Sequence, residues 1–325
     1  MSHNLGSTRA RSRAAAIQVR GLRKSFGDHV VLDGIDLDVA EGTVFSLLGA
    51  NGAGKTTTVR ILSTLTAPDS GGVRVNGHDL FRDADSVRRA IAVTGQFSAV
   101  DDLLTGMENV VLMADLRHLP KDEGRRRAAE LLERLDLAEA AGKPTSTYSG
   151  GMKRRLDLAM TLIGDPKIIF LDEPTAGLDP RSRRTMWAIV RDLVAQGVTI
   201  LLTTQYLEEA DQLADRIAVL DRGGLVAEGT PAELKRLVPG GHVILQFAEV
   251  GALESAARTF HSAVPDADAL TLLVPCDAGV ASLRALLGRL EAESIEVASL
   301  SVHSPDLDDV FLALTGSEEP KVVAR

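Results

Sequence analysis

The chain has 325 residues, of which 45% are hydrophobic and 25% are charged, and its formal net charge is −9. This composition is typical of a soluble globular protein with one large domain or two medium ones. The acidic balance argues against a protein that binds the phosphate backbone of nucleic acid. The single cysteine, Cys276, excludes an intramolecular disulfide, and the seven histidines show no zinc-ligand spacing with it.

Residues 1–15 contain arginines but lack the apolar run of a secretory signal, so we expect a flexible basic tail. No stretch of the sequence approaches the roughly 20 apolar residues that are needed to span a bilayer. If the protein acts at a membrane, another chain must cross it.

Residues 16–238 alternate short apolar runs with longer helical patterns, which is typical of an α/β domain. Nearly continuous hydrophobicity predicts parallel strands buried on both faces, at residues 44–49, 167–173 and 198–205. Two runs that alternate apolar and polar residues suit an antiparallel edge sheet, at residues 16–22 and 31–39. Helical periodicity predicts helices at residues 55–63, 102–117, 122–137, 181–195 and 207–216.

A Pro-Gly-Gly sequence within residues 236–243 interrupts this rhythm and predicts a domain boundary. Residues 239–325 then alternate strands and helices of their own, and we expect a small α+β domain. The predicted strands are 242–247, 269–274 and 296–302, and the predicted helices are 251–260, 279–293 and 306–314.

The sequence GANGAGKTT follows the first predicted parallel strand and opens a predicted helix, which is the context that a phosphate-binding loop requires. Its glycines let successive N–H groups point at phosphate oxygens, Lys55 can reach the β and γ phosphates, and the Thr56 hydroxyl can ligate Mg²⁺. The loop predicts contacts to ATP from Gly49, Asn51, Gly52, Ala53, Gly54, Lys55, Thr56 and Thr57.

Two acids lie at the carboxyl end of the apolar strand IIFLD, where ligands of parallel sheets collect. Asp172 is suited to hold Mg²⁺, and Glu173 is suited to polarise the water that attacks the γ-phosphate. The alternative is that a strand emerging into solvent simply ends in acids, but the phosphate loop makes that alternative the weaker one.

Ser149, Gly150 and Gly151 precede a helical pattern, and such a bare helix N-terminus can bind an anion. With the phosphate loop and the acidic strand, this segment resembles the signature of ATP-binding subunits of ABC transporters, most often LSGGQ. The sequence here is YSGGM, so Tyr148 and Met152 depart from the usual residues.

The resemblance implies roles for further residues and a helical subdomain at about 97–163. Phe26 falls where the family places an aromatic ring against adenine. Gln96 falls where a glutamine contacts the nucleotide and Mg²⁺ and links them to the membrane partner. Asp179 falls in the loop that crosses between subunits. Without the resemblance, Phe26 would be read as a core residue and Gln96 as a surface residue.

Gln205 stands where most members of this family carry a histidine that contacts the γ-phosphate. Glutamine can donate or accept a hydrogen bond but cannot become cationic. We expect Gln205 to orient the γ-phosphate or the attacking water and count it, with Glu173 and Lys55, among the catalytic residues. The alternative is that it only ends the strand.

Residues 203–234 and 307–316 resemble the ATP-binding subunits of the daunorubicin/doxorubicin-resistance group of drug exporters. The resemblance implies an ATPase that drives export of a drug, antibiotic or lipid-like compound. It implies an integral membrane permease as partner, a peripheral position at the cytoplasmic face of the membrane, and a regulatory or assembly role for the small domain.

In this family two ATPase domains pack head to tail, so the signature of one faces the ATP of the other. One phosphate loop and one signature therefore imply a homodimer, or a heterodimer with a related subunit. Two other functions stay open: a soluble ABC-type ATPase in translation or DNA repair, and a regulatory module that binds ATP with little turnover.

Overall fold

The computed structural model describes residues 14–95, 99–238, 241–276, 280–303 and 305–315. The chain divides into two compact units, Met1–Pro231 and Ala232–Arg325. This division falls ahead of the boundary at residue 238 that the Pro-Gly-Gly sequence suggests.

The first unit is built on a six-stranded sheet in the order β10-β9-β3-β8-β7-β6. Five of its strands run parallel, and only β10 pairs antiparallel, to β9. The three predicted parallel strands lie side by side at its centre, and every residue of β3, β7 and β8 is buried. The bounds are β3 Val44–Leu48, β6 Ile91–Thr94, β7 Ile168–Asp172, β8 Thr199–Thr204, β9 Arg216–Asp221 and β10 Gly224–Gly229.

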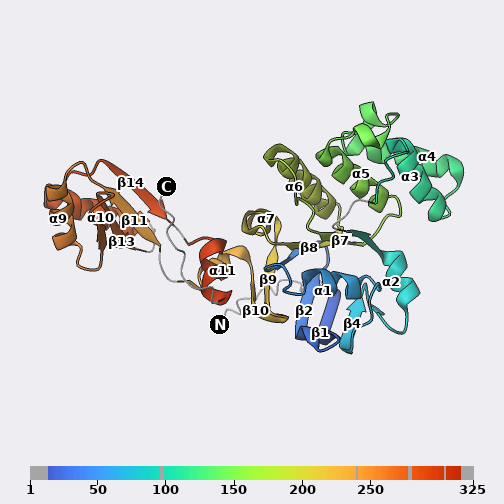
Figure 1. Ribbon diagram of the computed structural model, residues 1–325, viewed down its shortest axis with the longest axis horizontal. Coiled ribbons are helices and arrows are strands. Elements are labelled where there is room, and N and C mark those ends of the chain that lie inside the picture. Colours follow the sequence, from blue (N-terminus) through green and yellow to red (C-terminus); the bar gives the residue numbers. More distant parts are fainter. Residues whose placement is uncertain (1–13, 96–98, 239–240, 277–279, 304, 316–325) are drawn as a thin grey trace, which may run out of the picture. The chain divides into compact units, whose positions relative to one another are not determined.

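A four-stranded antiparallel sheet in the order β2-β1-β4-β5 lies beside it, and the two predicted edge runs form its long strands. Helix α1 lies between this sheet and β7, contacting β2 and β7 (Figure 1). Apolar residues of both sheets and of α1 form one core. The bounds are β1 Ala15–Phe26, β2 His29–Ala40, α1 Lys55–Leu62, β4 Ser70–Val75, β5 His78–Asp79 and α2 Ala84–Ala90.

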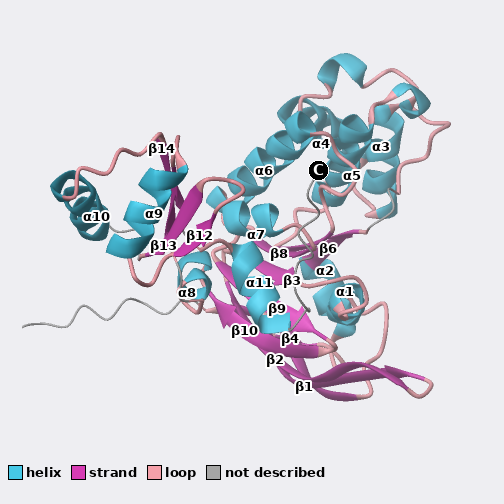
Figure 2. Cartoon of the chain, turned by 60° about the vertical axis from the view of Figure 1, so that its left-hand side comes forward, coloured by secondary structure: helices cyan, strands magenta, loops and turns pink. Residues whose placement is uncertain are grey.

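Helices α3, α4 and α5 form a lobe without strands (Figure 2). Helix α3 begins later than the predicted residue 102, because Thr105 and Glu108 form a capping box that fixes the first turn. Helix α4 ends before the predicted residue 137, and Asp136 follows it with a φ of 56°. The bounds are α3 Gly106–Leu116, α4 Lys121–Arg134 and α5 Gly150–Leu162, with 3-10 turns at Ala138–Ala140 and Thr145–Thr147.

Helices α6 and α7 follow the central strands β7 and β8, and the short helix α8 begins at the last residue of the first unit. The bounds are α6 Pro180–Ala195, α7 Leu207–Leu213 and α8 Pro231–Lys235. Helix α7 ends at Leu213 rather than at the predicted residue 216, because Arg216 already begins β9. The proline at the first position of α6 suits a helix start, because the backbone N–H at that position would have no acceptor within the helix.

The second unit contains an antiparallel sheet in the order β12-β13-β11-β14, and residues of the sheet pack with residues of α9 and α10 in a core of their own. The predicted strands and helices are present, and β12 is an additional short strand. The bounds are β11 His242–Gln246, α9 Val250–Thr259, β12 Val264–Asp266, β13 Thr271–Pro275, α10 Val280–Ala292, β14 Ser299–His303 and α11 Leu307–Thr315.

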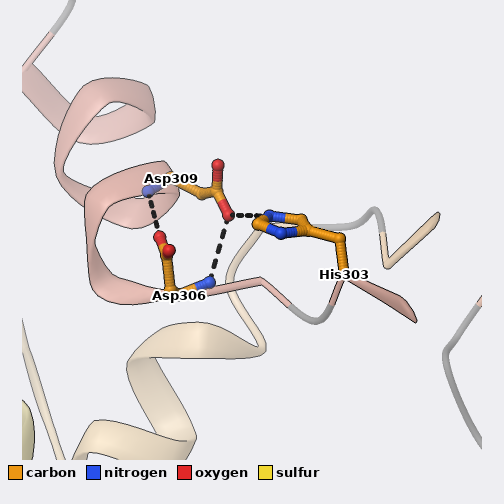
Figure 3. Close-up of side chains that lie close together, drawn as sticks. All are labelled: His303, Asp306 and Asp309. Atoms are coloured by element: carbon orange, nitrogen blue, oxygen red, sulfur yellow. Dashed lines mark hydrogen bonds and ion pairs between the residues drawn. The ribbon is translucent and has the colours of Figure 1, made fainter. Parts of the chain in front are cut away.

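The start of α11 is fixed by a reciprocal pair of acids (Figure 3). Asp306 accepts a hydrogen bond from the Asp309 backbone at 3.0 Å, and Asp309 accepts one from the Asp306 backbone at 3.1 Å. His303 Nε2 lies 3.1 Å from the same Asp309 carboxylate. These bonds satisfy backbone N–H groups of the first turn, so the cluster is accounted for as a helix cap.

Candidate active site

The predicted phosphate loop connects β3 to α1 at the carboxyl end of the parallel sheet. Gly52 and Gly54 have φ values of 82° and 109°, which residues other than glycine rarely adopt. A Cβ on Gly54 would also lie 2.6 Å from Leu32 Cδ2 and 2.8 Å from the Val31 carbonyl. The loop therefore depends on glycine for both its backbone conformation and its close packing.

Lys55 is buried beneath this loop, with 5% of its side chain exposed. Its Nζ donates to the carbonyls of Gly49 at 2.7 Å and Ala50 at 3.0 Å, and lies 3.9 Å from Glu173 Oε1. Burial lowers the pKa of Lys55, and the nearby carboxylates of Glu173 and Asp172 oppose that shift. The amine is thus a desolvated donor placed between the loop and the acids.

Thr56 and Asp172, which the sequence analysis assigns to Mg²⁺, lie in direct contact. The Thr56 hydroxyl donates to Asp172 Oδ1 at 3.2 Å, and the carboxylate is almost fully buried. A hydroxyl and a carboxylate oxygen brought together in this way form the hard-oxygen donor set that Mg²⁺ prefers. The residues present therefore fit a magnesium ion at this point.

Thr203 is a site residue that the sequence analysis missed. Its hydroxyl donates to Asp172 Oδ1 at 2.5 Å and accepts from the Glu173 backbone N–H at 3.2 Å. The parallel register of β7 and β8 places Thr203 directly opposite Asp172. The sequence could have indicated Thr203 through the two predicted strands 167–173 and 198–205. Aligning their carboxyl ends as neighbours in a parallel sheet places the threonine beside the acids.

A cavity of about 510 Å³ opens in front of these groups. It is lined by several of the predicted site residues together with His29 and Val31, which the sequence analysis did not predict as site residues. Phe26 is half exposed among the residues that line the cavity, and Lys24 Nζ lies over its ring at 5.1 Å from the centroid. The lining residues are Phe26, His29, Val31, Asn51, Gly52, Gly54, Lys55, Thr56, Thr57, Glu173 and Gln205.

The predicted signature residues do not line this cavity. Ser149 is the N-cap of α5, accepting from the Met152 backbone at 3.3 Å, and Gly150 and Gly151 form the first turn. Asp179 is the N-cap of α6, where hydrogen bonds from Ser182 and Arg181 lower its pKa. The structure thus groups the predicted residues into two separate sets. Gln96 lies outside the described residues.

Gly151 packs against α6 so closely that a larger residue would not fit. A Cβ there would lie 2.5 Å from Ser182 Oγ and 2.9 Å from Ser182 Cβ, whereas a Cβ on Gly150 would meet only Leu178 Cδ2, at 3.9 Å. We expect Gly151→Ala to lower the free energy of unfolding by about 1–3 kcal/mol through overpacking.

The neighbouring glycine supplies the control for this prediction. Gly150→Ala should change stability by less than about 0.5 kcal/mol. Combining Gly151→Ala with Ser182→Gly should recover much of the loss relative to Ser182→Gly alone. Urea unfolding of the four variants measures both effects, and equal stability of the two single alanine variants would contradict the close packing.

The phosphate loop, the paired acids and the capped SGG helix on this α/β fold define an ATPase of the ATP-binding cassette type. Residues 32–176 match the family model described as ABC transporter. Solved structures agree: an ATP-binding subunit of an ABC transporter is 28% identical with a TM-score of 0.61, covering 68% of this chain and 92% of that chain. The ADP conformation of another ATP-binding cassette is 25% identical, with a TM-score of 0.63 and the same coverage of both chains.

Curated relatives extend the similarity over nearly the whole chain. The daunorubicin resistance ATP-binding protein DrrA3 of Streptomyces coeruleorubidus is 49% identical, covering 93% of this chain and 96% of the relative. The daunorubicin/doxorubicin resistance ATP-binding protein DrrA of Streptomyces peucetius is 47% identical, covering 93% and 92%. The linearmycin resistance ATP-binding protein LnrL of Bacillus subtilis is 35% identical, covering 92% and 98%.

This chain belongs to the ABC transporter family, among the ATP-binding proteins of the daunorubicin/doxorubicin-resistance group. The predicted fold class and the predicted ATPase of an exporter are confirmed, and the translation or DNA-repair alternative receives no support. Among the described residues, no helix has both the length and the apolar character that crossing a membrane requires.

Proposed function

We propose that the chain is the energy-coupling ATPase subunit of an exporter for an amphipathic compound of the drug, antibiotic or lipid-like class. The observation that carries the proposal is the convergence of Lys55, Thr56 and Glu173 on one cavity, with Asp172 directly behind them. The names of the relatives support the substrate class, since they include daunorubicin resistance and linearmycin resistance.

Binding of ATP falls to the first set of predicted residues. The N–H groups of the loop and the Lys55 amine hold the phosphates, while Phe26 stacks on the adenine. Thr56, Asp172 and Gln96 would hold Mg²⁺, directly or through bound water. The ion would supply charge neutralisation at the phosphates.

Hydrolysis falls to Glu173, whose carboxylate accepts a hydrogen bond from the attacking water. The water oxygen forms a bond to the γ-phosphorus while the bond to the β,γ-bridging oxygen breaks, and ADP leaves with that electron pair. The water proton passes to Glu173 or onward to the released phosphate. Lys55 stabilises the negative charge that develops on the phosphate oxygens.

Gln205 lies on the same cavity as Glu173, at the end of β8. We expect Gln205→Ala to slow ATP turnover by about tenfold to a hundredfold, because one polar group that orients the γ-phosphate or the water is lost. Nucleotide affinity should change little. Steady-state hydrolysis together with nucleotide titration tests this, and unchanged turnover would remove Gln205 from the mechanism.

The separation of the SGG helix from the cavity supports a head-to-tail dimer. An anion-binding helix N-terminus that does not line the cavity of its own phosphate loop can serve the ATP of a second copy or of a related subunit. Ser149, Gly150, Gly151 and Asp179 would then complete the partner's site. The small domain, residues 239–325, would regulate or assemble this complex on a membrane permease at the cytoplasmic face.

The exporter proposal is tested in a strain from which the gene has been removed. Intracellular accumulation of a fluorescent anthracycline should rise in that strain, return to the original level with the wild-type gene, and stay high with Glu173→Gln. Equal accumulation with and without the wild-type gene would exclude anthracycline export as its function.

A further inference from the structure

Arg154 lies in α5, one turn after the SGG residues, and its guanidinium is buried against the loop that carries the acids. Its Nε donates to the Pro174 carbonyl at 2.9 Å. Its Nη2 donates to the carbonyls of Asp172 at 3.0 Å and Glu173 at 3.2 Å. Its Nη1 donates to the Gly95 carbonyl at 2.7 Å. One side chain therefore binds three consecutive carbonyls of the acidic turn and the carbonyl of Gly95, which directly follows β6.

Burying a guanidinium is costly unless its donors are satisfied. Among the described residues, the carboxylate that forms an ion pair with Arg154 is Asp157, which lies 3.5 Å from Nη1 and accepts a backbone hydrogen bond from Ala99. Burial lowers the pKa of Arg154. The closest bonds of this buried cation thus go to backbone carbonyls and not to a carboxylate, so the main result of burying it is to fix that backbone.

The backbone that it fixes is strained at the residue that matters most for hydrolysis. Glu173 has a φ of 49°, a left-handed conformation that residues other than glycine adopt at a cost. Thr203 accepts hydrogen bonds from the Glu173 N–H. Arg154 donates to the carbonyls of residues 172, 173 and 174. These bonds supply the surrounding constraint that a strained residue needs, and they set the direction of its carboxylate.

We propose that Arg154 is a positioning residue for the ATPase reaction, holding the acid-bearing turn 172–174 in place from the signature helix. The proposal rests on the proposed roles of Glu173 and of the SGG segment. Because α5 begins with the residues that would face the partner's ATP, engagement of that ATP is transmitted through Arg154 to the turn that carries Glu173. The side chain thereby links the two ATP sites of a dimer.

The next residue in the helix is a matched control. Arg155 Nη1 donates to the Leu135 carbonyl at 3.1 Å and to Asp136 Oδ2 at 2.9 Å. It therefore also joins α5 to a backbone carbonyl and a carboxylate, but within the helical lobe and away from the acids. A general loss of helix packing would affect both arginine variants, whereas loss of positioning affects only one.

The experiment measures four quantities in the full chain. They are kcat, the ATP concentration that gives half-maximal turnover, the Hill coefficient of turnover and the equilibrium affinity for MgATP. We expect Arg154→Gln to lower kcat by about tenfold to a hundredfold, as a small misplacement of a reacting group does. The affinity for MgATP should stay within about threefold, since the phosphate loop is untouched. The Hill coefficient should fall toward one, and Arg155→Gln should keep wild-type values of all four quantities.

A second variant covers the outcome in which Arg154→Gln fails to fold because it leaves Asp157 buried and unpaired. Arg154→Met combined with Asp157→Asn removes both charges and should fold with the same loss of kcat. Wild-type kcat in a folded Arg154 variant, or an equal loss in Arg155→Gln, would overturn the proposal alone. Full activity of Glu173→Gln would instead overturn the role of Glu173, and the positioning proposal with it.

Discussion

Glu173→Gln is expected to reduce ATP turnover by about 100-fold to 10,000-fold, the range attributed to a positioned general base. The carboxamide has the shape of the carboxylate but cannot accept the water proton. The backbone bonds from Glu173 to Thr203 and Arg154 do not involve the side chain, so the strained turn should persist. Affinity for MgATP should therefore be retained.

Slow hydrolysis should also trap the proposed head-to-tail dimer in its closed form. Light scattering of Glu173→Gln at saturating MgATP should give the mass of two chains, while the ADP-bound form should be monomeric. Glu208→Gln is the matched control, because Glu208 is an exposed acid whose ion partner, Arg183, lies 3.7 Å away. A monomer at saturating MgATP, or turnover like that of the control, would contradict the assignment.

Lys55→Met should weaken MgATP binding by about tenfold to 150-fold, which corresponds to the loss of a charged hydrogen bond worth about 1.5–3 kcal/mol. Turnover should fall further still if, as we propose, the same amine stabilises the charge that develops on the phosphate oxygens. Methionine is similar in length to the buried Lys55 side chain, so the variant should stay folded, although the carbonyls of Gly49 and Ala50 lose this donor.

Calorimetric titration with MgATP measures the affinity, and thermal unfolding of the same samples measures the stability of the fold. Lys167→Met is the control, since Lys167 is exposed at the opposite end of β7. Wild-type affinity in Lys55→Met would show that the amine does not contact the phosphates. A folded variant that has lost affinity would support the proposed contact.

Local patterns account for the parts of the fold and site that the sequence predicted. The glycines of the phosphate loop and the continuous hydrophobicity of β3, β7 and β8 are each contained in fewer than about ten residues. Strands β6 and β9 were missed because their short runs, IAVT and RIAVLD, show no periodicity that separates a strand from a helix.

The positioning residues depend instead on contacts between distant segments. Thr203 reaches Asp172 only through the register of two parallel strands, and Arg154 reaches Pro174 only because α5 lies against the turn after β7. In the sequence Arg154 is one of two adjacent arginines on an otherwise ordinary helix. Arg154 differs from Arg155 in the residues that its side chain contacts. Helical periodicity alone does not predict those contacts.

The central claim is that this ATPase drives a separate membrane-spanning subunit. The most direct test is affinity purification of Glu173→Gln from native membranes with MgATP, followed by mass spectrometry of every co-purifying chain. The account predicts one polytopic membrane protein in stoichiometric amount. Recovery without any membrane protein, or with ribosomal or repair proteins in its place, would contradict it.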